Sequence, residues 1–266
     1  MFSGVLTVKE VVLKIKFLGT GTSTGIPEIG CSCAVCQSTD SKDKRLRASV
    51  LISEKGRNIL IDCGPDFREQ MLHLPFEKID GVLLTHEHYD HVGGIDDLRP
   101  FCRFGDVSVY AAKNVAESIR KRMPYIFAEK KYPGVPNIEM KEIDNEPFPV
   151  AGVQITPVWV KHYFLKILAY RIGNMAYITD MKTIDDEELP KLQNLDLLVV
   201  NALRLREHLS HQNLEQAIAF AQKVNAKSTY FIHMSHEMGL HEEMQKTLPP
   251  NIFFAYDGLE LEIESV

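Results

Sequence analysis

The sequence has no long apolar run and no low-complexity tract, and it contains only one tryptophan and five cysteines in 266 residues. No stretch approaches the ~18 consecutive apolar residues that a membrane-spanning helix needs. The cysteine count is odd, which argues against a disulfide framework. Lys and Arg total 30 against 36 Asp and Glu, a formal net charge of -6. This acidic balance argues against a general nucleic-acid-binding protein. The lack of a long apolar stretch argues against a membrane partner.

The N-terminal segment MFSGVLTVKEVVLKIKF carries charges where a signal peptide needs its apolar core. We therefore expect a cytoplasmic protein, in which clustered thiols are more often metal ligands than disulfides. The hydrophobic content of 45% is ample for a buried core. Because the chain has no linker, repeat or shift in composition, we expect residues 1–266 to form a single domain.

Short runs rich in apolar and β-branched residues recur along the chain. The predicted strands are 11–18, 48–53, 58–62, 81–85, 107–111, 153–160, 168–172, 176–179, 197–200, 229–233 and 252–256. Helical patterns lie between them at 114–122, 184–192 and 213–224. Several strands are apolar throughout, as strands covered on both faces tend to be. The pattern indicates a layered α/β domain, although the strand order stays open.

Polar side chains repeatedly follow the end of an apolar strand. The residues in these positions are Asp62, His86, His162, Asp180 and His233. Loops at strand ends are where a rigid scaffold can gather side chains from distant parts of a chain. We therefore expect a functional site at these strand ends.

The densest group of potential metal ligands is THEHYDH, residues 85–91, which directly follows the apolar run GVLLT. His86 and His88 are two residues apart on an extended segment and project to one side, while Asp90 and His91 follow as the chain turns. Imidazole and carboxylate together suit Zn²⁺, Mn²⁺ or Fe better than Ca²⁺ or Mg²⁺. Four groups cannot complete two metal sites. The further candidates at strand ends are His162, Asp180 and His233.

The pattern HxHxDH, followed by a lone His, an Asp after a strand and a late His, resembles the metallo-β-lactamase superfamily. The resemblance implies an α/β fold, an αββα sandwich of two mixed β-sheets flanked by helices, with a dinuclear site at one edge. The ligands it implies for one metal are His86, His88 and His162. Those it implies for the other are Asp90, His91 and His233, with Asp180 bridging the two. It also implies that Asp62, in the segment IDCG, orients these ligands from behind.

Three of the five cysteines fall in GCSCAVC, residues 30–36. Their CxCxxC spacing supplies three thiolates, whereas a structural zinc takes four ligands and an iron–sulfur cluster usually takes four cysteines. Cys63 and Cys102 lie in apolar segments and are expected in the core. A better fourth ligand is a histidine three residues after His233. The predicted structural zinc site is Cys31, Cys33, Cys36 and His236.

The segment FLGTGTSTGIP followed by GCSCAVC resembles more closely the phosphoribosyl 1,2-cyclic phosphate phosphodiesterase family. The match continues through ILIDCG, LLTHEHYDHVGG, HMSH and YDG, from about Lys14 onward, and leaves 1–13 as an N-terminal extension without a counterpart. This resemblance implies a metal-dependent hydrolase with two divalent metals, Zn or Mn, a separate structural Zn and a homodimeric state. The implied reaction is hydrolysis of a small cyclic phosphodiester, such as 5-phosphoribosyl 1,2-cyclic phosphate.

Two metals at one site can lower the pKa of a bridging water, so that hydroxide is available at neutral pH to attack phosphorus. The leaving alkoxide would then need a proton. His211 lies at an expected helix start, where backbone N–H groups also favour anions, and it matches a histidine of the phosphodiesterase family. Asp90 and His211 are therefore the predicted catalytic residues. The remaining histidines that we interpret as surface or capping residues are His73, His208 and His241.

Other functions stay open. A pyrroloquinoline quinone biosynthesis protein B-like, non-hydrolytic protein would share the CxCxxC loop but depart from an intact HxHxDH, so the complete ligand set favours a hydrolase. A tRNA-processing nuclease would be expected to carry a clasping arm and more positive charge. A β-lactamase or thioesterase would not need the cysteine-rich site. Cyclic nucleotides and RNA cyclic phosphates remain credible substrates. Segments 99–104 and 125–136 are expected to line or cover the pocket.

Overall fold

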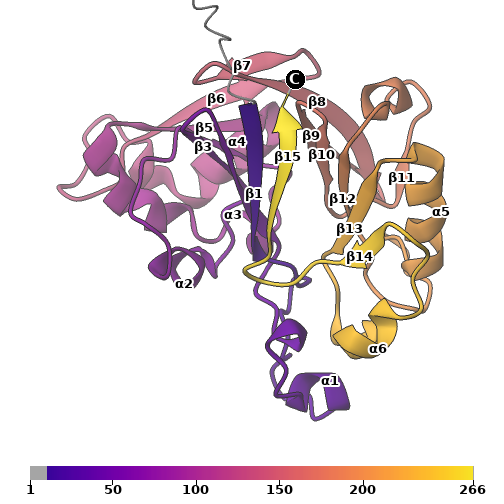
Figure 1. The fold of residues 1–266 in the computed structure, drawn as a ribbon. Helices are drawn as coiled ribbons and strands as arrows, with labels where there is room; N and C mark the ends of the chain where they lie inside the picture. The colour runs from indigo at the N-terminus through magenta and orange to yellow at the C-terminus, as the bar shows by residue number, and fades with distance from the viewer. Residues whose placement is uncertain (1–10, 266) are drawn as a thin grey trace, which may run out of the picture.

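Two mixed β-sheets packed face to face form the centre of the structure, a computed structural model that describes residues 11–265 (Figure 1). The expected N-terminal extension lies outside the described residues up to residue 10, and 11–13 already belong to the first strand. Along these described residues, no helix is long and apolar enough to cross a membrane.

The first sheet has the order β15-β1-β2-β3-β4-β5-β6. Its strands are β1 (Val11–Gly19), β2 (Ser49–Glu54), β3 (Arg57–Ile61), β4 (Gly81–Leu83), β5 (Val107–Ala112), β6 (Ile138–Ile143) and β15 (Glu260–Ser265). The pairs from β15 to β3 are antiparallel, and those from β3 to β6 are parallel. The two ends of the described chain therefore lie side by side in β1 and β15.

The second sheet has the order β11-β8-β9-β10-β12-β13-β14, with β7 paired to β8. Its strands are β7 (Phe148–Val150), β8 (Val153–His162), β9 (Leu165–Ile172), β10 (Met175–Ile178), β11 (Thr183–Ile184), β12 (Leu197–Asn201), β13 (Ser228–Ile232) and β14 (Ile252–Phe254). Strands β10, β12, β13 and β14 run parallel, whereas β8, β9 and β10 alternate in direction.

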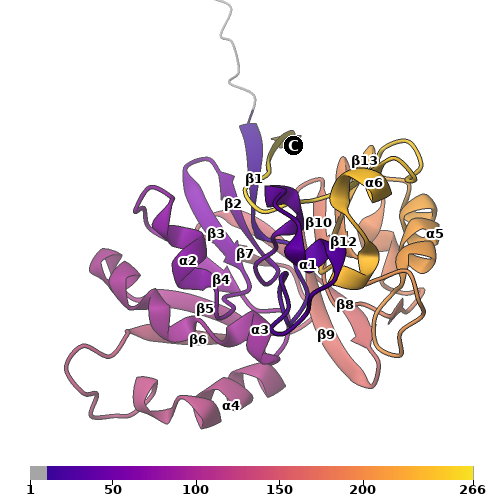
Figure 2. The same cartoon turned by 90° about the horizontal axis from the view of Figure 1, so that it is seen from below.

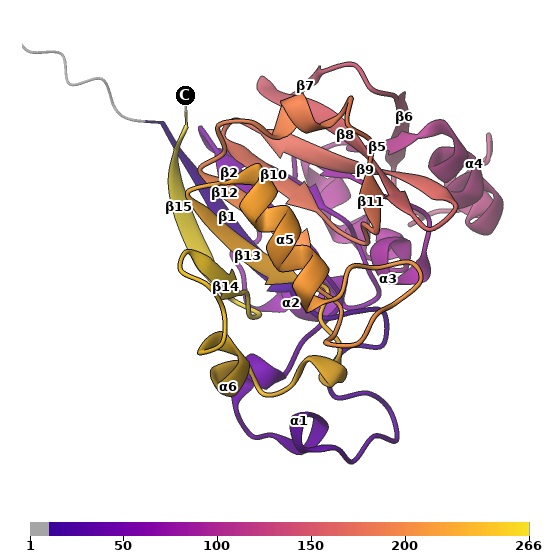
Figure 3. The same ribbon diagram turned by 90° about the vertical axis from the view of Figure 1, so that its right-hand side faces the viewer.

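Helices cover the outer faces of both sheets. The longer ones are α2 (Phe67–Leu72) and α4 (Lys113–Arg122) beside the first sheet, and α5 (Leu214–Val224) across the second (Figure 3). The shorter ones are α1 (Ala34–Gln37), α3 (Tyr89–Val92) and α6 (His241–Gln245), with 3₁₀ turns η1 (Ser41–Asp43), η2 (Ile95–Phe104), η3 (Pro124–Ile126), η4 (Leu189–Leu192) and η5 (His236–Met238). This is the predicted α/β sandwich of two mixed sheets flanked by helices.

Strand β12 is buried along its whole length, and its side chains alternate between two cores. Leu197 and Val199 belong to the cluster between the sheets, while Leu198 and Val200 belong to the cluster beneath α5. This explains why β12 is apolar at every position but the last, since both of its faces are covered. Such a strand holds its ends rigidly, which is useful where loops carry a site.

The predicted strands and the helices at 114–122 and 213–224 are confirmed. Asn213 is the N-cap of α5, and its Oδ1 accepts the backbone N–H of Gln216 at 2.9 Å. The predicted helix at 184–192 is wrong, because 183–184 form a strand and only Leu189–Leu192 form a 3₁₀ turn. Pro190 has no N–H to donate, and it disfavours helical geometry at Leu189. Strands β6, β7, β11 and β15 were not predicted, since they are short or interrupted by charges.

Candidate metal centres and active site

Five strand ends bring the predicted site residues to one edge of the sandwich. Strands β3 and β4 run parallel in the first sheet, and β8, β10 and β13 share one direction in the second. The residues that follow or end these strands are Asp62, His86, His162, Asp180 and His233. All five are buried. The strand directions therefore gather side chains that lie far apart in sequence.

Three of these residues have a left-handed backbone, which is uncommon away from glycine. The φ angles are 62° at Asp62, 56° at Asp180 and 56° at His233. Each such residue costs on the order of 1 kcal/mol and persists only where the surrounding structure holds it. Strain at three converging strand ends is typical of a functional site.

Two glycines let the HxHxDH segment approach the loop after β3. A Cβ on Gly64 would lie 2.1 Å from the carbonyl oxygen of Asp90, and one on Gly94 would lie 2.1 Å from that of Gly64. Any side chain would prevent this contact. The close approach places Asp62 beneath the ring of His91, whose Nδ1 is 2.7 Å from Oδ2 of Asp62.

The side chains at this edge form two adjoining groups. One contains His86, His88 and His162, and the other contains Asp90, His91, Asp180 and His233. Within each group the potential ligand atoms all lie within 4.8 Å of one another. Asp180 also meets this criterion with His162 and His211. It therefore lies between the groups, as expected of a residue that bridges two ions.

Buried imidazole nitrogens test whether a metal fits. Nε2 of His86 and Nε2 of His91 are both buried and have no hydrogen-bond partner. The other nitrogen of each ring is engaged, with Thr85 at 3.0 Å and with Asp62 at 2.7 Å. Nε2 of His91 lies 3.1 Å from a carboxylate oxygen of Asp90 and 3.2 Å from one of Asp180. Orphaned buried nitrogens beside carboxylates are costly without a cation, so the donor set fits divalent metals.

The side chains of the two groups differ in charge. Burial holds the pKa of His86 well below its usual value, so the ring stays neutral as a metal ligand must be. Burial alone would raise the pKa of Asp90 and Asp180, but the imidazoles of His91 and His233 outweigh it. Both carboxyl groups therefore have pKa values far below the ordinary range and are anionic. Burial lowers the pKa of His91, but the carboxylates of Asp90 and Asp180 outweigh it and raise that pKa well above its usual value, so a cation at this place, a proton or a metal, compensates the carboxylates.

Asp62 is fully buried and makes no contact with the second group except through His91. It accepts the backbone N–H of Thr85 at 2.9 Å and the Thr85 hydroxyl at 2.9 Å. With Nδ1–H of His91 directed at Asp62, Nε2 is left to face the carboxylates. This geometry supports the orienting role expected of Asp62. Thr85, which also contacts His86, was not singled out from the sequence.

The side chains of His162 and His211 lie next to each other at the loop before α5. Nδ1 of His162 donates to the carbonyl oxygen of Ser210 at 3.0 Å, which leaves Nε2 for an ion. Nε2 of His211 lies 2.9 Å from Oδ1 of Asp180, and its ring centroid is 4.6 Å from that of His162. Burial lowers the pKa of His211 to about 4, against the opposing effect of Asp180. The predicted helix-start histidine thus reaches the site.

His208 contradicts its interpretation as an ordinary surface residue. Its Nδ1 lies 3.1 Å from Nδ1 of His211, and it accepts the backbone N–H of Ser210 at 3.3 Å. A histidine three residues before His211 in a strand-end loop was the available signal. His73 is an exposed surface residue, as predicted. The same interpretation is wrong for His241, which is buried and accepts a hydrogen bond from Arg45.

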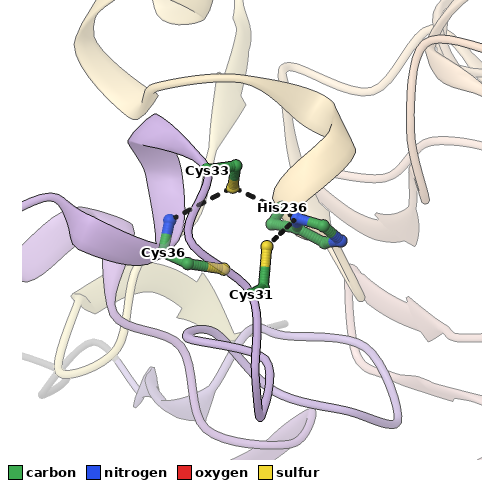
Figure 4. Close-up of side chains that lie close together, drawn as sticks. All are labelled: Cys31, Cys33, Cys36 and His236. Carbon is green, nitrogen blue, oxygen red and sulfur yellow. Dashed lines mark hydrogen bonds between the residues drawn. The ribbon is translucent and has the colours of Figure 1, made fainter.

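A second candidate metal centre lies in the loop that carries α1. Figure 4 shows the side chains of Cys31, Cys33, Cys36 and His236 pointing toward one another. Nδ1 of His236 is 3.3 Å from Sγ of Cys31 and 3.2 Å from Sγ of Cys33. The backbone N–H of Cys36 and then His236 lower the pKa of Cys33 to about 6, which favours the thiolate that metals bind. Three sulfurs and one imidazole suit a closed tetrahedral zinc site.

Few apolar contacts hold this loop in place. The apolar cluster around the cysteines contains only Ile26, Val35 and Cys36, with Leu240 packed against it. In Figure 2, α1 lies beside α6, which follows Leu240. The loop also bonds to the segment after β13, through Thr22 N to Met234 O at 3.0 Å. One short segment therefore connects both candidate centres.

That segments 99–104 and 125–136 line or cover the pocket stays a prediction, and one side chain of each is held by a neighbouring element. Phe101 packs against Phe67 with ring centroids 5.8 Å apart, in the core beneath α2. The hydroxyl of Tyr125 donates to Asp96 at 2.9 Å.

Known proteins resemble this chain over most of its length. Residues 57–234 match the family described as the beta-lactamase superfamily domain. A crystal structure of a new diphosphatase from the PhnP family superposes with a TM-score of 0.90 at 40% identity, covering 96% of this chain and 98% of that one.

Two further relatives differ in length and distance. An octanoyltransferase of Porphyromonas gingivalis is 49% identical over 250 residues, which are 93% of this chain but 51% of that protein, so the chain spans about half of its length. Zn²⁺-bound PqqB from Methylobacterium extorquens has a TM-score of 0.77 at 20% identity, covering 93% of this chain and 99% of that one. The second likeness concerns the fold alone.

Proposed function

The chain belongs to the beta-lactamase superfamily and, within it, to the PhnP family, and on this premise we propose that it is a dinuclear metal-dependent phosphodiesterase. Its proposed substrate is a small cyclic phosphodiester such as 5-phosphoribosyl 1,2-cyclic phosphate. The coarser description, a metal-dependent hydrolase of the metallo-β-lactamase fold, follows from the family and from the ligand groups.

One observation carries the proposal, namely two adjoining ligand groups with the carboxylate of Asp180 between them. His86, His88 and His162 would hold one ion, and Asp180 would join it to the group around Asp90. The residues that complete the second group are His91 and His233. A pair of divalent cations held there would supply Lewis acidity, which lowers the pKa of water and neutralises negative charge that develops on the phosphoryl oxygens.

Other groups of the protein orient the metal ligands around that pair of cations. Asp62 fixes the ring of His91, and the Ser210 carbonyl fixes the ring of His162. His211 presents an imidazole beside Asp180 and is 12% exposed, so it is within reach of a substrate at the opening. We assign it to donate a hydrogen bond to a phosphate oxygen or a proton to the leaving alkoxide. The cysteine-rich centre would hold a structural zinc.

The diphosphatase at 40% identity supports a second candidate reaction, hydrolysis of a diphosphate bond. Both reactions break a P–O bond and draw on the same two-cation chemistry. The octanoyltransferase name is not transferred, because this chain corresponds to about half of that protein. The intact HxHxDH likewise favours hydrolysis over a non-hydrolytic role in quinone cofactor synthesis.

The test is a ³¹P NMR time course of the metal-replete protein with 5-phosphoribosyl 1,2-cyclic phosphate and, separately, with a nucleoside diphosphate. Asp180→Ala should abolish turnover, and His211→Gln should lower it by roughly 10²–10⁴-fold while the metal content is kept. His73→Ala, at an exposed histidine away from the site, is the matched control. Loss of the cyclic ester resonance favours the phosphodiesterase, and loss of the diphosphate resonances alone favours the second candidate. Turnover of neither by fully loaded protein would refute both.

A further inference from the structure

A cavity of about 460 Å³ opens beside the candidate active site, lined by Lys182, Glu207, His208 and Leu209. The contacts of the two ring nitrogens of His211 show where this cavity lies relative to the metal ligands. Nε2 faces Asp180 at 2.9 Å, whereas Nδ1, on the other side of the ring, faces His208 at 3.1 Å. The cavity therefore lies on the side of His211 away from the metal ligands. Its volume is in the range of small-molecule sites, roughly 300–1,000 Å³.

Lys182 brings positive charge into this cavity. Its Nζ donates to the carbonyl oxygen of His208 at 2.7 Å and to Oε1 of Gln216 at 2.9 Å. Both acceptors are neutral, and an ammonium has three N–H donors, so one donor remains. The carboxylate paired with it is that of Glu207, 3.7 Å away and 76% exposed. Its charge is thus only weakly compensated, because an exposed pair is screened by water.

The ammonium group is also held in place. Gln216, which accepts from Lys182, belongs to the capping box with Asn213 in the first turn of α5. The N-terminal end of a helix carries partial positive charge, which adds to that of the lysine. A fixed ammonium loses little conformational entropy when an anion binds to it.

His208 offers a second donor. The backbone N–H of Ser210 donates to its Nδ1 at 3.3 Å, which makes Nδ1 an acceptor and places the ring proton on Nε2. Within residues 11–265, the structure gives Nε2 of His208 no hydrogen bond. Two nearby arginines are less available, since Arg204 and Arg206 both pair with Glu237.

We propose that this cavity binds a second phosphate group of the substrate, a terminal phosphomonoester, through Lys182 and His208. The inference rests on the proposed function, in which the phosphodiester that is cleaved lies over the metal ligands. A weakly compensated ammonium and a free imidazole N–H, one histidine away from the reacting centre, are suited to a dianionic group. Leu209 supplies an apolar wall. The chain has a net charge of -6, so most of its surface repels anions. The donor pair of Lys182 and His208 makes this cavity a place where an anion is favoured.

Paired substrates test the proposal, namely one cyclic phosphodiester with and without a terminal 5-phosphate. The measured quantity is the ratio of kcat/KM for the two esters. The ratio should exceed one in the wild type and fall about tenfold or more in Lys182→Met. It should rise about threefold in Glu207→Gln, which removes a competing charge from an exposed position where folding is not at risk.

The control is Lys161→Met. Lys161 lies on β8, which pairs with β11 directly after Lys182. It pairs with Asp185 at 2.5 Å and does not line the cavity. Its ratio should match that of the wild type. Equal losses of kcat/KM for both esters in Lys182→Met, or an unchanged ratio in Glu207→Gln, would overturn the subsite while leaving the phosphodiesterase intact.

A binding measurement separates the two proposals. Inorganic phosphate is titrated into the metal-loaded protein, and the ring resonances of His208 are followed by NMR. A shift that is retained in Lys161→Met and lost in Lys182→Met supports the subsite even if neither ester is hydrolysed. No shift in the wild type overturns it. Absence of turnover together with a phosphate-dependent shift would refute the phosphodiesterase alone.

Discussion

Replacement of Asp62 by asparagine is the sharpest test of how the metal ligands are oriented. Asp62 contacts no candidate ion itself, and its carboxylate accepts hydrogen bonds from Thr85 and from Nδ1 of His91. Asparagine has nearly the same shape but only one acceptor oxygen. If that oxygen keeps the Thr85 bonds, the NH₂ group faces Nδ1 of His91.

An NH₂ group and an Nδ1–H cannot bond to each other, so the proton of His91 should move to Nε2. That nitrogen faces Asp90 and Asp180, and a proton there would occupy the position of the ion. Loss of such an orienting partner typically costs 10–100-fold in metal affinity. We expect Asp62→Asn to lower the affinity for one of the two proposed active-site metals by this factor. Its loss of unfolding free energy should be smaller than that of Asp62→Ala.

Asp62→Ala should behave differently. It would leave the Thr85 N–H and the His91 Nδ1–H without partners in a fully buried environment. Each orphaned donor costs about 1–3 kcal/mol, so the free energy of unfolding should fall by on the order of 3–5 kcal/mol. Such a loss is a large part of the free energy of unfolding of a typical folded domain, which is roughly 5–15 kcal/mol.

The assay is competition with a chelator of known affinity, followed by urea unfolding of each variant with and without metal. Asp186→Asn, at a residue whose side chain is 90% exposed, is the matched control. Wild-type affinity for both metals in Asp62→Asn would refute the tautomer argument. Unchanged stability of Asp62→Ala would show that these buried donors find other partners.

Two further predictions concern the N-terminal loop and the histidine of α6 that contacts Arg45. Cys36→Ser should remove one zinc per chain and lower the melting temperature, because so few apolar contacts hold that loop; unchanged zinc by elemental analysis would contradict a metal there. His241 accepts from Arg45 at 3.0 Å, and burial, then Arg45, lowers its pKa to about 4, below the unfolded value near 6.5. The unfolded chain binds the proton first, so this stability is present above about pH 6.5 and is lost as pH falls toward 4. His241→Gln keeps an acceptor without titrating, and its unfolding free energy should fall about 1–2 kcal/mol less than that of the wild type between pH 7 and 4, after allowance for solvent screening. A constant difference between the two proteins over that range would contradict the assignment.

Several strands and one predicted helix were decided by tertiary contacts, which a local sequence pattern does not contain. Strands β6 and β15 alternate charged and apolar residues because they are half covered, so no apolar run marks them in the sequence. The pattern at 184–192 favoured a helix, but a proline at position 190 and pairing of β11 with β8 decided otherwise. Long apolar strands such as β12 were predictable, since burial on both faces leaves little choice of residue.

Local sequence is enough to identify the candidate metal ligands and the spacing of neighbouring ones. His86 and His88, like the cysteines of the α1 loop, are separated by a few residues, and over that distance backbone geometry dictates where side chains point. The tertiary structure decided which distant groups meet. It placed Asp180 between the two ligand groups, brought His236 to the cysteines and set Lys182 and His208 around one cavity. These contacts depend on strand order and direction, and local spacing contains no information about either.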